Sequence, residues 1–309
     1  MNTSEKAYCG VDVSKYHLDV MFKGRSNRFD NTVKGVESMK VRIGKVHYIF
    51  ESTGGYERLA AWLLMDAGAD VSIVNPARVR LFALGIGQLA KTDPIDAGVI
   101  AHFAAVTRPA PSQKPSVSQR QLTSLVDRRQ QLKGMEAAET NRLETEGEPQ
   151  FRKMIQKHLR WLKKEIETIE ARIEKAIESN ASMKAKSQRI RSIKGLGKVC
   201  AATLLAHIPE IGELSRQEVA ALAGLAPYNR DSGSSSKRRH IHGGRKRIRA
   251  CLYMAAVSAI QHNPAMKQFY NRLVNENHRP KKVALTAVMR KLVIVANSVV
   301  KNPEFCVVS

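Results

Sequence analysis

The sequence is poor in cysteine, and its four cysteines form no close pairs. They stand far apart, at Cys9, Cys200, Cys251 and Cys306, without any Cys-x-x-Cys spacing. Zinc sites and disulfide frameworks need cysteines at characteristic spacings, so this pattern argues against both and favours a reducing cytosol. The sequence also lacks any run of eighteen apolar residues, and its polar start does not resemble a signal peptide. We therefore expect a cytoplasmic protein with no membrane span.

Acidic residues are scarce relative to basic ones, most of all late in the chain. The 309 residues include 51 Lys and Arg against 28 Asp and Glu, which gives a net charge of +23. Of this excess, +17 lies between Ala181 and Ser309. A surplus of this size is typical of proteins that bind a polyanion. A membrane surface would call for a basic amphipathic helix with an aromatic face, which we do not find, so nucleic acid is the expected partner.

Strand-like and helix-like segments alternate in the first part of the chain. The apolar, β-rich stretches are residues 8–13, 17–22, 46–50 and 71–74. The helix-like segments are residues 38–43 and 57–67, and Asn75-Pro76 opens another helix. Lys15 and Lys23-Gly24 fall at tight connections between the first strands. This order predicts an α/β sheet layered with helices, and Pro109, Pro111 and Pro115 predict a domain boundary after it.

A long helical hairpin is predicted next. Between Ile155 and Ala176, apolar residues recur at alternating steps of four and three, as in the seam of a coiled coil. A weaker pattern covers residues 119–145, and Gly147 with Pro149 separates the two helices. A solvated spacer is the simpler reading. Because an apolar stripe needs a partner to be buried, we interpret the hairpin as a dimerisation arm.

The last part of the chain is predicted to be helical. Residues 193–198, Ile-Lys-Gly-Leu-Gly-Lys, precede an apolar helix and have the form of a helix-hairpin-helix. In such a hairpin, glycines let backbone N–H groups approach phosphates at a helix N-terminus. Residues 249–262 and 282–300 are apolar enough to form core helices, with breaks at Asn263-Pro264 and Arg279-Pro280.

Four acidic residues stand where predicted strands end or a helix begins. Asp12 closes the first strand in Gly-Val-Asp-Val-Ser-Lys, and Glu51 closes a later one in Phe-Glu-Ser-Thr-Gly-Gly-Tyr. Asp93 and Asp96 lie in Lys-Thr-Asp-Pro-Ile-Asp-Ala. With Pro94 as the first helical residue, Asp93 is the N-cap and Asp96 lies three residues on along the same edge. These positions can direct all four side chains into one pocket.

Clustered carboxylates repel one another and need a cation to remain ionised together. Hard oxygen ligands suit Mg²⁺ or Mn²⁺. Two such ions about 4 Å apart orient a phosphodiester and stabilise its attacking and leaving oxygens. The four positions therefore favour a metal-dependent reaction on nucleic acid. Taken alone, Asp93 would be only a helix cap, and we interpret the nearby Asp19 as an ordinary surface charge.

The order Asp, Glu, Asp-x-x-Asp resembles the RuvC-like nuclease branch of the RNase H fold. The motifs GVDVSK, ESTGGY and KTDPIDA are similar to those of the DEDD transposases of insertion-sequence family 110, whose relatives include the Piv invertases. The resemblance covers nearly the whole chain. It implies an α/β RuvC-like domain over residues 1–110, a coiled-coil helical hairpin over 111–185, and a mostly α-helical transposase domain with a helix-hairpin-helix over 186–309.

A Ser/Gly-rich stretch, Ser232-Gly-Ser-Ser-Ser, runs directly into basic sequence. Seven of the thirteen residues from Lys237 to Arg249 are Lys or Arg. Arginines beside such a loop can hold and neutralise a phosphate. The basic residues expected to contact nucleic acid are Lys194, Lys198, Lys237, Arg238, Arg239, Arg245, Lys246, Arg247 and Arg249. Composition alone favours a flexible loop whose basic neighbours only bind the nucleic-acid backbone.

The family resemblance changes that interpretation. Members of the family carry the motif SGSS at this place in the C-terminal transposase domain, and its first serine is the nucleophile. That serine matches Ser232, while Ser234, Ser235 and Ser236 remain competitors by sequence. No general base can be assigned; Asp231, His240 and His242 are candidates only by proximity in the chain. The resemblance also implies donor and target DNA as partners, a structured bridge RNA that selects both, and assembly as a dimer or a tetramer.

Three other functions fit part of this pattern. A RuvC-like junction-resolving nuclease explains the carboxylates and the charge but leaves the serine loop without a task. A non-catalytic nucleic-acid-binding protein would not need the four carboxylates. An actin-like sugar kinase normally has a glycine-rich Asp-x-Gly-Thr turn and a second phosphate motif, and we find neither. A DNA recombinase therefore accounts for the most features.

Overall fold

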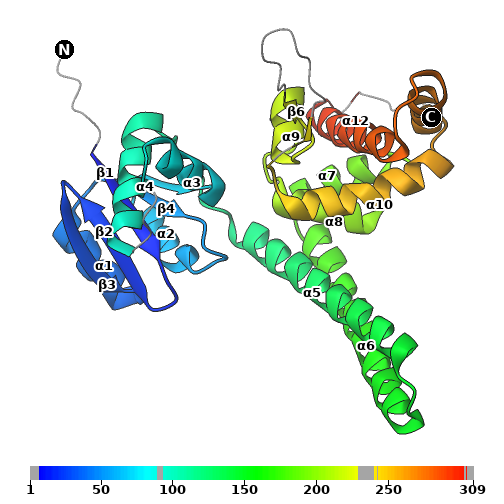
Figure 1. The fold of residues 1–309 in the computed structure, drawn as a ribbon, viewed down its shortest axis with the longest axis horizontal. Coiled ribbons are helices and arrows are strands. Elements are labelled where there is room, and N and C mark those ends of the chain that lie inside the picture. The colour runs from blue at the N-terminus through cyan, green and yellow to red at the C-terminus, as the bar shows by residue number, and fades with distance from the viewer. Residues whose placement is uncertain (1–6, 89–92, 229–239, 242, 303, 305–309) are drawn as a thin grey trace. The chain divides into compact units, whose positions relative to one another are not determined.

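The fold comes from a computed structural model that describes residues 7–88, 93–228, 240–241, 243–302 and 304 (Figure 1). The chain divides into two compact units, Met1–Lys114 and Pro115–Ser309. Each unit has its own hydrophobic core, and each is described by itself.

The first unit is built on a mixed sheet of five strands in the order β3-β2-β1-β4-β5. The strands are β1 Tyr8–Val13, β2 His17–Phe22, β3 Arg25–Asp30, β4 His47–Glu51 and β5 Val71–Val74. The first three form an antiparallel meander, and β4 and β5 run parallel to β1. The sheet is compatible with an RNase H-like region, as the sequence suggested.

Helices cover both faces of this sheet (Figure 1). The helices are α1 Val33–Ile43, α2 Glu57–Asp66, α3 Pro76–Gly85 and α4 Asp93–Thr107. Cys9, Val11 and Val13 share a buried cluster with α1 and α2, whereas Tyr8 packs with α3 and α4. Because side chains alternate along a strand, the even-numbered positions of β1 face the α4 side.

Most predicted elements of this unit are confirmed, but β3 was missed. Its sequence, Arg-Ser-Asn-Arg-Phe-Asp, is mostly exposed and shows no clear apolar alternation. The turn before it is set by positive φ angles at Lys23 (48°) and Gly24 (74°), as the sequence suggested. The first helix begins five residues earlier than predicted, because Thr32 caps it by accepting a hydrogen bond from the Gly35 N–H. Likewise, α4 begins at Asp93 rather than Pro94.

The second unit begins with a helical hairpin of α5 Val117–Thr145 and α6 Pro149–Glu178. On α6, the apolar stripe is buried from Leu162 through Ile177. On α5, Leu122, Val126 and Leu132 belong to the same buried cluster. This part of the stripe therefore finds its partner within the chain, so burial of the stripe does not by itself require a dimer.

Shorter helices complete the second unit. They are α7 Ala181–Arg191, α8 Lys198–His207, α9 Arg216–Leu222, α10 Lys246–His262, α11 Pro264–Asn271, the π-helical turn η1 Arg272–Glu276 and α12 Lys281–Lys301. A short ribbon pairs β6 Pro227–Tyr228 with β7 His240–Ile241. One continuous core joins these helices to the part of the hairpin where α5 begins and α6 ends. Its residues run from Leu122 to Val300.

One helix of the described chain, α12, is long and apolar enough to cross a membrane by length and composition alone. More than half of the apolar stretch of α12 is buried inside the unit. The helix packs there against α7, α9, α10 and α11. It also carries Arg290 and Lys291 at its middle. These contacts are those of a core helix.

Helix α4 lies so close to β1 that Gly10 has no room for a side chain. A Cβ there would clash with the Ala97 carbonyl oxygen and lie 2.5 Å from the Ala101 nitrogen. We expect Gly10→Ala to destabilise the fold by about 1–3 kcal/mol, because backbone atoms cannot move aside as a flexible side chain can. Urea unfolding monitored by circular dichroism measures the change.

Gly98→Ala provides the matched control on the same interface. Its added Cβ would lie 3.8 Å from the Met21 Cε, which is an ordinary contact. Replacing a glycine inside a helix should then raise stability by about 0.5–1 kcal/mol. Equal effects of the two variants would contradict the proposed close packing at Gly10.

Candidate active site

Two of the predicted acidic residues occupy equivalent positions on neighbouring parallel strands. In the β1–β4 ladder, Val11 lies beside Phe50, and the next residue on each strand is Asp12 and Glu51. Both are half-buried and lie on the α4 side of the sheet. The Asp12 carboxylate accepts a hydrogen bond from the Val13 N–H at 3.0 Å. The sheet therefore brings these two carboxylates to one edge.

Helix α4 brings a third carboxylate towards that edge. On α4, Ala97 lies against Gly10, at the middle of β1. Phe103, further along α4, packs in the same hydrophobic cluster as Tyr8, at the start of β1. The helix therefore runs antiparallel to β1, and its first turn points towards the carboxyl end of the strand. Asp96, half-buried, lies in this turn.

The described side chains do not form a complete set of metal ligands. Within the described part of the chain, no group of three or more His, Cys, Asp or Glu side chains lies close enough to hold a metal ion. The Asp93 side chain, the fourth expected ligand, lies outside the described residues. What fits a hard divalent cation is the donor chemistry, since all the expected ligands are carboxylates. Mutual repulsion of these groups is the physical reason that a cation is needed to gather them.

The interpretation of Asp19 as a surface charge was wrong. This residue is 5% exposed, and both of its carboxylate oxygens accept hydrogen bonds from the Arg28 guanidinium, at 2.8 and 3.1 Å. A charged group is rarely buried without such a partner. The partner was hidden in the sequence because it lies on β3, the strand that the apolar pattern did not reveal.

A second carboxylate that the sequence did not single out shapes the loop after Glu51. Glu57 is buried, and its Oε2 accepts hydrogen bonds from the N–H groups of Thr53 (3.1 Å) and Gly55 (2.8 Å). The loop is thus held against the start of α2. A glutamate two residues after a Gly-Gly pair, at a helix start, was the available signal.

Ser232 and the segment 229–239, with Lys237, Arg238, Arg239 and Asp231, lie outside the described residues, as does His242. The residues that flank this segment, near the β6–β7 ribbon, are described. Glycines 224, 243 and 244 all have φ angles near 67° and pack backbone against backbone, so that a Cβ at Gly224 or Gly244 would clash. The Arg245 N–H also donates to the Leu222 carbonyl at 2.8 Å. The two ends of the serine-bearing segment are therefore held together.

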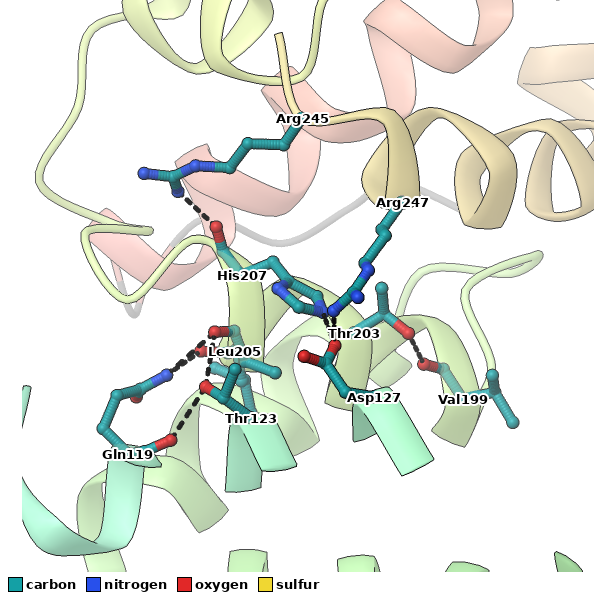
Figure 2. Close-up of polar contacts among 10 residues, drawn as sticks. Gln119, Thr123, Asp127, Val199, Thr203, Leu205, His207, Arg245 and Arg247 are labelled. Atoms are coloured by element: carbon teal, nitrogen blue, oxygen red, sulfur yellow. Dashed lines mark hydrogen bonds and ion pairs between the residues drawn. The ribbon is translucent and has the colours of Figure 1, made fainter. Parts of the chain in front are cut away.

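Two arginines that were expected to contact nucleic acid have acidic partners in the second unit, and Figure 2 shows one of these pairs, Arg247 with Asp127. Arg247 pairs with Asp127 of α5, which also lies 3.2 Å from the His207 Nε2. Arg245 contacts Glu210 at 3.5 Å and donates to the His207 carbonyl. Asp127 and His207 were missed because nothing in their local sequence connects them to a basic segment so far along the chain.

The remaining described cations differ in their surroundings. Lys198 lies 3.4 Å from Glu174, and Arg249 donates to the Gly243 carbonyl. Lys194 and Lys246 are exposed. The Lys198 side chain is 63% exposed as well, so these three lysines present accessible positive charge near the predicted helix-hairpin-helix and the start of α10.

The predicted helix-hairpin-helix borders a cavity of about 780 Å³ among α5, α6, α8 and α10. Gly195 has a φ of 105° and lies against Ala259, and both Gly195 and Gly197 line the cavity. Cys200 and Cys251 line it as well. The hydrogen bond between these two thiols lowers the pKa of Cys251, and with burial it raises the pKa of Cys200. Both are free thiols, as is Cys9.

Two family models match the chain. A model of the IS110 DEDD type, described as Transposase, covers residues 9–146, and one described as Transposase IS116/IS110/IS902 family covers residues 187–271. Together they span more than two thirds of the sequence. The first includes the carboxylates of the sheet edge and of α4, and the second includes the helix-hairpin-helix, the serine segment and the basic sequence after it.

Curated relatives agree with the family models. The chain is 28% identical over 313 residues to the pilin gene-inverting protein of Moraxella bovis, with 96% of each chain covered. The corresponding protein of Moraxella lacunata matches with the same identity and coverage. A 42 kDa protein of insertion element IS900 from Mycobacterium paratuberculosis is 33% identical over 109 residues, which cover 33% of this chain and 27% of the relative. The chain therefore belongs to the IS116/IS110/IS902 family of transposases, enzymes that cleave and rejoin DNA.

Proposed function

We propose that this transposase uses a RuvC-like, metal-binding carboxylate site in its first unit and a serine nucleophile in its second. The observation that carries the proposal is the placement of Asp12 and Glu51 side by side on parallel strands. The first turn of α4, with Asp96, points to the same edge of the sheet. This is where the carboxyl ends of parallel strands gather functional groups in open sheets.

The residues that would hold Mg²⁺ or Mn²⁺ are Asp12, Glu51, Asp93 and Asp96. A divalent cation bound there would neutralise charge on a phosphodiester and orient it. The chain's own part is to fix two of the ligands on rigid strands, since side chains on strands are held more firmly than side chains on loops. The Glu57 contacts to Thr53 and Gly55 support the loop that follows Glu51.

Ser232 is the proposed nucleophile. Its Oγ forms a bond to phosphorus while the bond from phosphorus to the leaving deoxyribose oxygen breaks, and the serine proton is balanced by the proton that the leaving oxygen gains. Attack by a hydroxyl of a second strand reverses the step, rejoins the DNA and restores the serine. The proton acceptor is not assigned; Asp231, His240 and His242 remain candidates.

Cations after the serine are proposed to neutralise charge on the reacting phosphate. The residues concerned are Lys237, Arg238, Arg239, Arg245, Lys246, Arg247 and Arg249. Lys194 and Lys198 are proposed to bind backbone phosphates beside the glycine hairpin. The closed glycine base supports this role, because it holds Gly224, which precedes the serine segment in the chain, beside Gly244 and the start of α10.

Donor and target DNA are the proposed substrates, selected by a bridge RNA in a cytosolic homo-oligomer. The large positive charge supports a second nucleic-acid partner. The outer part of α6 supports self-association, because Phe151, Met154 and Trp161 leave 46%, 66% and 49% of their surface exposed. Exposed apolar residues at helical spacing favour a partner helix. We propose the hairpin as the dimerisation arm on this ground.

We expect Asp12→Asn to abolish metal binding without unfolding the protein. Recombination of a plasmid substrate should fall about 100-fold or more, since several kcal/mol of metal stabilisation correspond to tenfold per 1.4 kcal/mol. Mn²⁺ binding by isothermal titration and plasmid recombination measure the two effects. Asp30→Asn is the matched control, because Asp30 is an exposed carboxylate of the same sheet. Normal recombination by Asp12→Asn would rule out the metal site.

Ser232→Ala should eliminate a covalent protein–DNA adduct, because no other group would then accept the phosphoryl bond. The adduct is detected by denaturing gel electrophoresis of end-labelled DNA before and after protease digestion. Ser234→Ala, Ser235→Ala and Ser236→Ala serve as controls and should retain it. If cleavage proceeds with no adduct in the native protein, the chain acts as a junction-resolving nuclease instead.

Nucleic acid that co-purifies with the full chain should contain one discrete structured RNA encoded next to its gene. Sequencing of the bound RNA, with an unrelated protein of similar net charge as the control, tests this. The control should recover a heterogeneous mixture, because charge alone does not select a sequence. A mixture on both proteins would count against guidance by RNA.

A further inference from the structure

Four charged residues form a row across the sheet of the first unit. In the β1–β2 ladder, Asp12 lies directly opposite Asp19, and in the β2–β3 ladder, Asp19 lies directly opposite Arg28. Glu51 extends the row on the other side of Asp12. Residues directly opposite on neighbouring strands share a face, so all four side chains lie on the α4 side. The row therefore carries three negative charges followed by one positive charge.

The Asp19–Arg28 pair joins a buried carboxylate to a guanidinium on a side chain that is about half exposed. Asp19 is 5% exposed, and the guanidinium holds both of its oxygens, at 2.8 Å through Nε and at 3.1 Å through Nη2. This two-point contact fixes the direction in which the carboxylate faces. Removing Arg28 would leave the buried Asp19 carboxylate without the guanidinium that balances it.

Asp19 is also the carboxylate that comes nearest to Asp12 in the antiparallel ladder. Opposite residues have Cβ atoms about 4.5–5.5 Å apart, which is within the range where like charges repel and where two carboxylates can bind one cation. An Asp19 carboxylate released from Arg28 would compete for, or add to, a cation at Asp12. An Arg28 guanidinium released from Asp19 would be attracted to Asp12 in the cation's place.

We propose that the Asp19–Arg28 pair sets the charge beside the carboxylate site, with each partner keeping the other away from the cation that Asp12 binds. The inference rests on the proposed metal site and assigns two positioning residues to it. Asp19 and Arg28 are not ligands in this scheme. Their joint charge is zero, so the carboxylates of Asp12, Glu51 and α4 supply the net negative charge that attracts the cation.

The two single substitutions should shift metal affinity in opposite directions. Arg28→Gln removes the positive charge but retains an amide that can donate to Asp19, so Mn²⁺ should bind more tightly. Asp19→Asn leaves Arg28 without its buried carboxylate, so Mn²⁺ should bind more weakly. Each shift should be about three- to tenfold, as expected for one unit charge roughly 5–10 Å from a divalent ion.

The double variant Asp19→Asn/Arg28→Gln should return the affinity to near the native value, because the pair is again neutral. Arg28→Lys retains the positive charge and is the matched control for the Arg28→Gln change. Mn²⁺ titration of the full chain, followed by the paramagnetic resonance signal of the free ion, measures each affinity. Thermal unfolding of each variant reports folding separately. A merely structural ion pair would lower stability in both single variants and leave Mn²⁺ affinity unchanged.

Distinct outcomes separate this inference from the proposed function. If the native chain binds no Mn²⁺, or binds it equally after Asp12→Asn, the metal site itself is wrong. If Asp12→Asn loses binding but Arg28→Gln binds no more tightly than Arg28→Lys, the charge-setting role is overturned. The Arg28 comparison decides the matter even if Asp19→Asn does not fold, because the Arg28 side chain is 53% exposed and tolerates substitution best.

Discussion

The close packing of α4 on β1 is the constraint on which the candidate site depends. Gly10 leaves room for the helix backbone, and Ala97 and Ala101 present only small side chains to it. The contact determines both the distance of the helix from the sheet and its direction along β1. Only with that direction does the turn containing Asp96 point to the edge where Asp12 lies, one residue before the end of β1. A larger residue at Gly10 would alter the site from a distance, through backbone displacement.

Charge is distributed differently in the two units. Around the sheet edge, acidic side chains lie beside one another, and a single arginine balances the most deeply buried of them. In the second unit, basic side chains predominate, yet Arg245, Arg247 and Lys198 each contact a carboxylate. Nucleic acid would have to displace these carboxylates before it could pair with the same cations. The number of basic residues therefore overstates the number of unpaired cations, whereas the net charge of +23 already includes these carboxylates.

The second unit shows how one helix, α6, can present two apolar surfaces. The part of α6 from Leu162 to Ile177 is buried against α5 and continues into the core that contains α8, α10 and α12. The outer part carries Phe151, Met154 and Trp161 on its exposed side. Periodicity in the sequence identified the helix and its buried seam, but it did not distinguish a partner within the chain from a partner in a second copy.

The sequence by itself determined the elements whose pattern is local. Alternating apolar residues predicted β1 and β2, Asn75-Pro76 marked the start of α3, and the order of acidic motifs indicated the family. The strand β3, the buried Asp19–Arg28 pair and the contact between Asp127 and Arg247 were decided only by tertiary structure. Local propensity depends on a few neighbouring residues, whereas a buried charge depends on a partner that the chain brings near only after it folds.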